Sequence, residues 1–194
     1  MREKALDSLK GKWGIAIGTF FIYGLIVGGL GLIPIVGSLA SLIITGPFMV
    51  GLCLFSFSIS RNGDTRLELI FDGFKNFGNA LGAYLLMVLF ILLWTLLLII
   101  PGIIAALSYS MTFYIMADDS SIGSMQAIDK SKAMMNGYKG KYFLMQLSFI
   151  GWALLCLLTV GIGFLWLIPY IQISNAKFYD DVKANWEANN AQPA

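Results

Sequence analysis

Reactive side chains are scarce in this sequence. It contains no histidine and only two cysteines, and charged residues make up 12% of its 194 residues, about half the share of a typical soluble domain. Without histidine the commonest general base is absent, and two cysteines alone make a zinc site improbable. The sequence also contains no P-loop, GxGxxG or GxSxG motif. We therefore expect a protein that is not an enzyme, with no catalytic residues, no metal and no cofactor.

Charge is missing altogether from three long runs. No Asp, Glu, Lys or Arg occurs in residues 13–60, 76–117 or 142–176. A helix needs roughly 20 apolar residues to cross a bilayer, so each run is long enough for two crossings, the third only just. A soluble core could not hide three such runs in a chain of this size. The sequence predicts an all-α, polytopic membrane helix bundle.

Each run is interrupted near its middle by glycine or proline, which predicts a turn between two helices. The interruptions are Gly31–Ser38, Ile99–Ile103 and Thr159–Gly163. We expect six transmembrane helices in three hairpins. The third run allows only about 17 residues per crossing, so a single tilted helix or a re-entrant pair remains an alternative there. Pro169 should kink the sixth helix.

All 13 Lys and Arg residues fall in four polar segments, namely residues 1–12, 61–75 and 118–141 and the tail from Lys177. If each run crosses twice, these segments share one side, which the positive-inside rule makes cytoplasmic. Both termini are then cytoplasmic. The net charge of +2 gives no indication of nucleic-acid binding.

The polar segments contain amphipathic patterns of their own. Thr65–Phe77 places Leu67, Ile70, Phe71 and Phe74 on one helical face, and Ser124–Met135 and the first twelve residues show similar faces. We expect these segments to lie on lipid headgroups as cytoplasmic amphipathic helices. Lysines and aromatic residues at their junctions with the apolar runs are expected to act as interfacial anchors. The predicted anchors are Lys10, Lys12, Trp13, Lys75, Phe77, Lys139, Lys141 and Tyr142.

The three junctions resemble one another. "SLKGKWG" (Ser8–Gly14), "GFKNFGN" (Gly73–Asn79) and "GYKGKYF" (Gly137–Phe143) each precede an apolar run, and "FYIMADD" and "KFYDDVK" follow two of the runs. We interpret the chain as a single membrane domain, residues 1–194, with a threefold internal repeat of approximately 1–63, 64–119 and 120–194. The alternative is that any junction between cytoplasm and membrane selects these residue types.

Polar side chains inside the runs are mild, and the densest group is "SYSMTFY". Its members Ser108, Tyr109, Ser110, Thr112 and Tyr114 could line a path for a solute, or could hydrogen-bond within the bundle. Acidic residues could converge on the cytoplasmic face, where capping or pairing with lysine is more common than metal binding. These residues are Asp64, Asp118, Asp119, Asp180 and Asp181.

Two features concern helix packing. Gly14 and Gly18, and again Gly24 and Gly28, form GxxxG patterns, which indicate close helix–helix contact within the chain or between chains. We expect them to pack against another helix of the same chain. Cys53 and Cys156 lie at depths that differ by roughly 10 Å along their helices. We therefore expect two buried thiols and no disulfide.

Four segments carry a resemblance to a known family. They are Leu89–Ile103, Tyr109–Asp119, Ala127–Phe143 and Leu147–Tyr170, and they resemble the bacterial membrane proteins grouped as domain of unknown function 975. "AIDKSKAMMNGYKGK" also resembles, more faintly, the membrane region beside some bacterial glycerophosphodiester phosphodiesterases. The resemblance implies a bacterial cytoplasmic membrane location and a multi-helix fold, and it transfers no biochemical role to individual residues.

These observations favour a non-enzymatic protein of the bacterial cell envelope that binds membrane lipids, another membrane protein or itself. Its bundle and its surface helices would provide the contacts. One alternative is a small transporter or exporter of an amphipathic solute. A second is an immunity protein against a membrane-active peptide.

Overall fold

The computed structural model describes residues 2–33, 36–159 and 161–190, and all regular structure within these ranges is helical. Pro34 and Val160, which belong to the first and third expected turns, lie outside the described residues. The elements in chain order are α1 (Arg2–Leu9), α2 (Trp13–Gly31), α3 (Val36–Ser60), α4 (Leu69–Asp72), the 3-10 helix η1 (Gly73–Asn76), α5 (Phe77–Leu97), α6 (Ile99–Tyr109), α7 (Thr112–Asp118), α8 (Ser124–Met134), α9 (Lys139–Leu158) and α10 (Phe164–Asn190).

Five segments of the described chain are long and apolar enough to cross a membrane. They are Trp13–Gly31, Leu39–Ser60, Leu69–Leu97, Ile99–Asp118 and Lys139–Leu158. The expected sixth segment, α10, is 27 residues long, but it is apolar only as far as Ala176 and then carries charges into the tail. Its charge-free part, Phe164–Ala176, covers only about 20 Å at 1.5 Å per residue. The fold is thus all-α with several long apolar helices.

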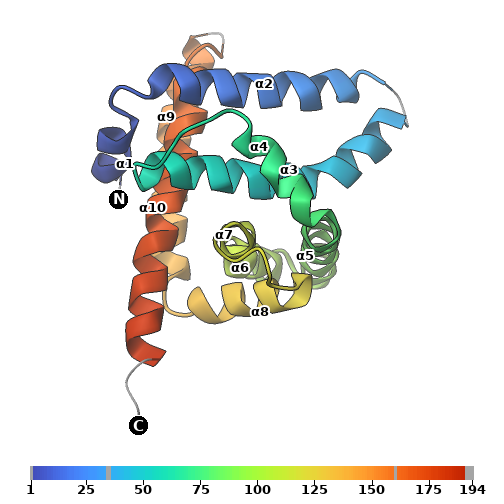
Figure 1. Cartoon of the computed structure of the whole chain (residues 1–194). Coiled ribbons are helices and arrows are strands. Elements are labelled where there is room, and N and C mark those ends of the chain that lie inside the picture. Colours follow the sequence, from blue (N-terminus) through green and yellow to red (C-terminus); the bar gives the residue numbers. More distant parts are fainter. Residues whose placement is uncertain (1, 34–35, 160, 191–194) are drawn as a thin grey trace.

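The long helices form three pairs that point in different directions (Figure 1). The first pair is α2 with α3, the second is α5 with α6 and α7, and the third is α9 with α10. In this view the first pair runs across the page, the second runs along the line of sight, and the third runs up the page. The pairs meet where α3, α7 and α10 contact one another, and the largest buried apolar cluster lies there.

Each short helix packs on the second helix of one of these pairs, which we call the returning helix. α4 lies on α3, α8 lies on α6 and α7, and α1 lies on α10, so each contacts the returning helix of the preceding pair, or of the last pair in the case of α1. Their apolar side chains point into the protein, since Leu9, Ile70 and Ile128 are fully or almost fully buried. These buried side chains therefore pack on the bundle, whereas their amphipathic patterns predicted helices that lie on lipid headgroups.

Two of the three junctions turn in the same way. Gly11 and Gly137 have φ angles of +75° and +81°, and each stands two residues before the start of a long helix, α2 or α9. Only glycine adopts this left-handed conformation without a steric penalty. The second junction instead continues through η1 into α5.

Close backbone contacts occur at glycines outside the GxxxG patterns. A Cβ atom on Gly51 would collide with the backbone of Ile70, and one on Gly73 would collide with the backbone of Pro47. These two glycines let α3 approach α4 and η1 closely. By contrast, a Cβ on any of the four GxxxG glycines of α2 would meet nothing within 4 Å. The expectation that this pattern packs against another helix of the chain is therefore wrong.

This difference between glycines predicts the effect of a methyl group at two positions. Gly51→Ala should destabilise the fold by about 1–3 kcal/mol, because overpacking forces the α3 and α4 backbones apart. Gly18→Ala should change stability by less than about 0.5 kcal/mol, because its Cβ enters open space. Thermal unfolding of both variants in one detergent measures this, and equal losses of stability would contradict the assigned contact.

Candidate functional site

Three aromatic rings meet at the centre of the bundle, one from each returning helix. Phe57 in α3 lies 5.6 Å from Tyr114 in α7 and 5.4 Å from Tyr179 in α10, measured between ring centroids. The rings of Tyr114 and Tyr179 are stacked at 5.9 Å. The Tyr114 hydroxyl donates to Oε1 of Gln172 over 3.0 Å, which joins α7 to α10 a second time. The rings thus fix the three helices to one another.

A group of charged side chains lies near these rings, at the ends of α3 and α7 and within α10. Arg61 contacts Asp118 over 2.8 Å and Asp180 over 2.6 Å, and Lys183 also forms an ion pair with Asp118. We call Arg61, Asp118, Asp180 and Lys183 the base network. The Asp118 side chain is only 13% exposed, so its contacts are screened less than those of surface ion pairs. The Tyr179 hydroxyl donates to the same carboxylate over 3.2 Å.

The base network keeps its cations charged. The hydrogen bond with Asp118 raises the pKa of Lys183 above its ordinary value. For Arg61, burial alone would lower the pKa, but hydrogen bonds with Asp180 and Asp118 outweigh it, and the pKa is raised. A raised pKa means that the stabilising charge of Lys183 is present at neutral pH and is lost only in strongly alkaline solution. Burial also raises the pKa of Tyr179, so its hydroxyl keeps its proton.

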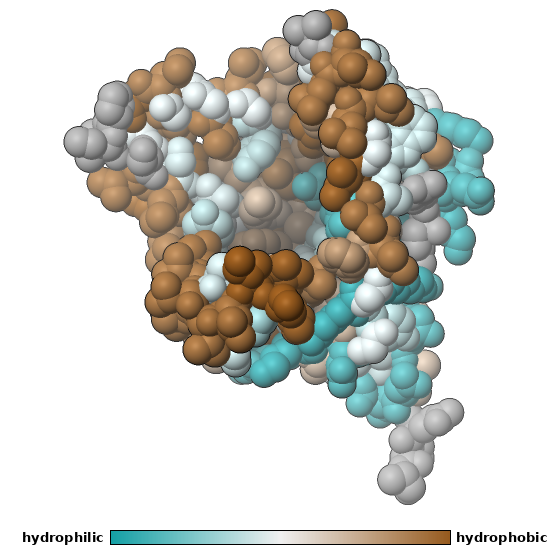
Figure 2. Space-filling model, turned by 180° about the vertical axis from the view of Figure 1, so that it is seen from behind, coloured by the Kyte–Doolittle hydropathy of each residue, from teal (hydrophilic) through white to brown (hydrophobic). Residues whose placement is uncertain are grey.

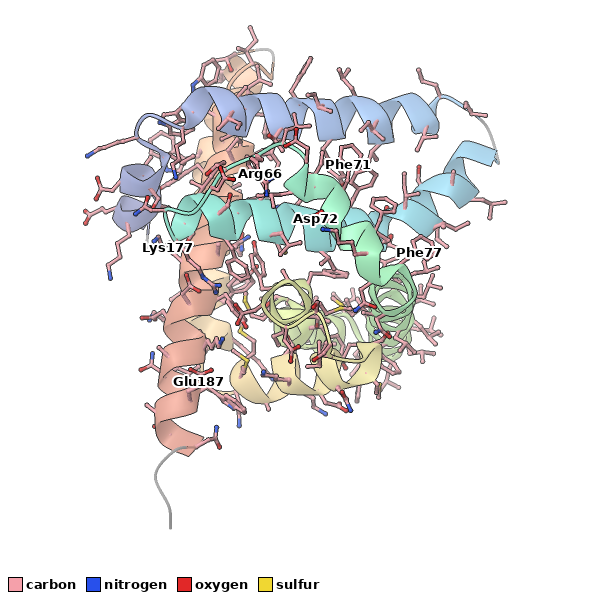
Figure 3. The ribbon with its side chains drawn as sticks, in the orientation of Figure 1. Arg66, Phe71, Asp72, Phe77, Lys177 and Glu187 are labelled. Atoms are coloured by element: carbon pink, nitrogen blue, oxygen red, sulfur yellow. The ribbon has the colours of Figure 1, made fainter. Side chains whose placement is uncertain are left out.

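Further contacts connect the starts of α5 and α9 to the part of the molecule that contains the base network. Lys177 of α10 donates to the backbone carbonyl of Ser60 at the C-terminal end of α3 (Figure 3). Lys141 near the start of α9 pairs with Asp181 of α10 over 3.0 Å. Asn76, just before α5, donates to the carbonyl of Ser120, just after α7, over 2.7 Å. The starts of α5 and α9 therefore lie on the same face of the molecule as the base network.

The acidic residues singled out in the sequence are partly brought together. Asp118 and Asp180 both contact Arg61, whereas Asp64 pairs with Arg66 over 2.9 Å. Asp119 accepts hydrogen bonds from the backbone and the hydroxyl of Ser121. These carboxylates therefore face cations, hydroxyls and amides. Within residues 2–33, 36–159 and 161–190, no group of three or more His, Cys, Asp or Glu residues is placed to hold a metal ion.

The predicted anchors in the first two junctions lie at the surface. Lys10 pairs with Asp7 over 2.7 Å, and Lys75 pairs with Asp72 over 2.8 Å. The side chains of Lys12 and Trp13 are half-buried where α2 begins, and Trp13 packs on a buried apolar cluster. Phe77 is exposed at the start of α5 (Figure 3), and its ring stacks on that of Phe74.

The third junction differs from this pattern. Tyr142, expected at the interface, is buried, and its ring lies 5.1 Å from that of Phe178 in α10. Lys141 reaches Asp181, and Lys139 is half-buried in the wall of a groove against α6. This part of the sequence thus supplies core packing as well as surface charge.

The "SYSMTFY" residues divide into two groups. Ser108 and Tyr109 line the groove that contains Lys139, which has a volume of about 210 Å³. The hydroxyls of Ser110 and Thr112 donate to backbone carbonyls three residues earlier, and Tyr114 is buried among the central rings. Only the first two residues therefore line an open space.

Apolar surface surrounds a hollow on the face opposite to the view of Figure 1. Figure 2 shows brown, hydrophobic lobes around this hollow, with hydrophilic residues gathered along one side and the lower edge. The most exposed apolar side chains belong to the turns of the three pairs, with Leu32 84%, Leu96 82% and Leu158 81% exposed. A nearly wholly apolar groove of about 270 Å³ also lies between α2 and the start of α10.

Two members of the base network, Arg61 and Lys183, were not identified from the sequence as partners of the acidic residues. Arg61 and Asp118 are separated by 57 residues, and Asp118 and Lys183 by 65. A signal was nevertheless present, because an aromatic residue precedes a charged one by four positions in each returning helix. The pairs are Phe57 with Arg61, Tyr114 with Asp118, and Tyr179 with Lys183.

Neighbouring aspartates provide a test of the base network. Asp118→Asn leaves Arg61 and Lys183 facing each other without the carboxylate that joins them, and should cost about 1–3 kcal/mol of stability. Asp119→Asn removes the same charge from an exposed residue that bonds only to Ser121, and should leave stability nearly unchanged. Thermal unfolding in detergent compares the two variants. Similar stability in both would show that the network does not hold the helices together.

The sequence matches one protein-family model. No match was found among curated proteins or among solved structures. Residues 95–186 match the model of a family described as "Protein of unknown function (DUF975)". The match begins near the end of α5 and ends in α10, so it includes Asp118, Asp180 and Lys183 of the base network. Over these residues the chain is similar to the DUF975 family.

Proposed function

We propose that the chain is an integral protein of the bacterial cytoplasmic membrane whose three helix pairs each leave from and return to the cytoplasmic side. The ion pair between Lys141 and Asp181 supports this topology, because it joins the start of α9 to the tail of α10. The contacts of Arg61 with Asp118 and Asp180 support it further, since they join the ends of three returning helices. Charged groups joined at such distances lie on one side of a bilayer.

The third return, through α10, is the shortest of the six proposed crossings. Its charge-free part covers about 20 Å, against a hydrocarbon core of about 30 Å. A locally thinned bilayer accommodates such a mismatch at modest cost. The position of α10 beside α3 and α7 supports a return by this helix, because its tail contacts the ends of both.

We also propose that the three pairs are copies of one unit, consisting of a short surface helix, an outgoing helix and a returning helix. The contacts of α1, α4 and α8 support this proposal, since each of these short helices lies on the returning helix of another pair. The aromatic residue followed by a charge four positions later, once in each returning helix, supports it independently.

The function that this arrangement supports best is non-enzymatic lipid binding. The observation that carries it is the apolar hollow between the pairs, whose surrounding lobes expose large hydrophobic side chains (Figure 2). In a bilayer, acyl chains are the molecules that can cover such a surface. The base network would hold the pairs together at one end while lipid occupies the space between them. A solute path along Ser108–Tyr114 is less well supported, because Thr112 and Tyr114 are sealed in the core.

The groove between α2 and α10 allows a direct test with matched glycine variants. Gly24 lines this groove, and Gly28 lies one turn further along α2 and does not line it. A Cβ meets nothing within 4 Å at either position, so Leu is sterically admissible at both. A photoactivatable residue at Leu25, in purified full-length protein, reports which molecule occupies the groove.

We expect phospholipid adducts at Leu25 that fall several-fold in Gly24→Leu and persist in Gly28→Leu, because only the first change fills the groove. Adducts that are equal in the two variants would refute a bound lipid at this place. Adducts with a second protein chain alone would favour a protein partner instead.

A further inference from the structure

A second groove combines an apolar wall with positive charge. It lies beside α5 and α6 and is closed by residues from α8 and from the start of α9. Lys132 and Lys139 line it together with Trp94 and Ile104, which are 46% and 47% exposed. Its volume of about 210 Å³ is below the 300–1,000 Å³ usual for enclosed small-molecule pockets. The groove therefore suits part of a longer molecule that continues into the surrounding membrane.

The two lysines of this groove differ from four other lysines of the chain in their partners. Lys10, Lys75, Lys141 and Lys183 each form an ion pair with a carboxylate of this chain. Within the part of the chain that the structure describes, neither Lys132 nor Lys139 forms one. Two ammonium groups that line one groove without a carboxylate partner attract an anion, and such charge gains strength where the surroundings are apolar.

The groove also offers an uncommitted hydrogen-bond donor. Tyr109 is buried, its ring packs 6.2 Å from that of Phe90, and its hydroxyl has no hydrogen-bond partner among the described residues. Ser108 beside it already donates to the carbonyl of Ile104. The hydroxyl of Tyr109 is therefore available to an oxygen of a bound molecule, below two lysines and beside an apolar wall.

We propose that this groove binds one anionic phospholipid. Its phosphate lies against Lys132 and Lys139, its ester oxygen accepts a hydrogen bond from Tyr109, and its acyl chain runs along Ile104 and Trp94. The charge of the two lysines selects an anionic headgroup over a zwitterionic one, because a zwitterionic headgroup carries its own cation. This inference rests on the proposed lipid-binding function and adds to it the class of lipid and the residues that recognise it.

The test compares two double variants that remove the same charge. Lys132→Gln with Lys139→Gln removes the two groove lysines. Lys4→Gln with Lys12→Gln removes two lysines of the same cytoplasmic side that also form no ion pair within the described ranges. Full-length protein is purified in detergent, offered phosphatidylglycerol and phosphatidylcholine with identical chains, and measured by native mass spectrometry. Leu25 adducts are recorded in parallel.

We expect the unmodified protein to retain phosphatidylglycerol about tenfold over phosphatidylcholine, a preference of about 1.4 kcal/mol. The groove variant should lose this preference, and the control variant should keep it. Equal selectivity in the two variants would overturn the proposal, and so would displacement of the lipid by inorganic phosphate at millimolar concentration. If selectivity fails while lipid adducts at Leu25 persist, only this inference falls; if both are absent, lipid binding itself falls.

Discussion

The structure depends on the attraction between a few charged side chains on one face of the bundle. Arg61 follows the end of α3, Asp118 ends α7, and Asp180 and Lys183 lie within α10; no two of these helices are joined by a short loop. Inside a membrane, apolar side chains gain little from packing on one another, because lipid is equally apolar. Ion pairs and the hydrogen bond from Tyr179 provide an attraction that lipid cannot replace. They explain how helix pairs that point in different directions stay together.

The open arrangement of the helix pairs follows from where the contacts between them lie. Contacts are dense at the base, where rings and charges meet, and the turns at the far ends expose Leu32, Leu96 and Leu158. Among the described residues of those turns, no ion pair or side-chain hydrogen bond joins one pair to another. The proposed lipid would place its acyl chains between the pairs. A hollow of this kind needs a rigid base, and a lipid with an anionic headgroup would be held where base and hollow meet, beside Lys132 and Lys139.

The sequence predicts the helices far better than their contacts. Charge-free runs and amphipathic patterns indicate the long helices and the buried faces of the short ones, because both depend on residues close in the chain. Ile70 lies on the predicted apolar face and is buried, but α4 contacts α3 where lipid was expected, and Phe71 of the same predicted face is 45% exposed. Likewise, GxxxG spacing marks Gly14 and Gly18, whereas the close approach occurs at Gly51, which no local pattern distinguishes. Partners more than 50 residues apart cannot be read from spacing alone.

All the proposals depend on one claim, namely that the base network lies on the cytoplasmic side of the membrane. Single cysteines at the exposed positions Glu3, Asp64, Ser120 and Glu187, in a chain without Cys53 and Cys156, test it with a membrane-impermeant thiol reagent. The account predicts that none of the four is labelled in intact cells and that all four are labelled once the membrane is opened. Labelling of any one of them from outside intact cells would contradict it, because the base network and the contacts of α1 with α3 and α10 join these segments.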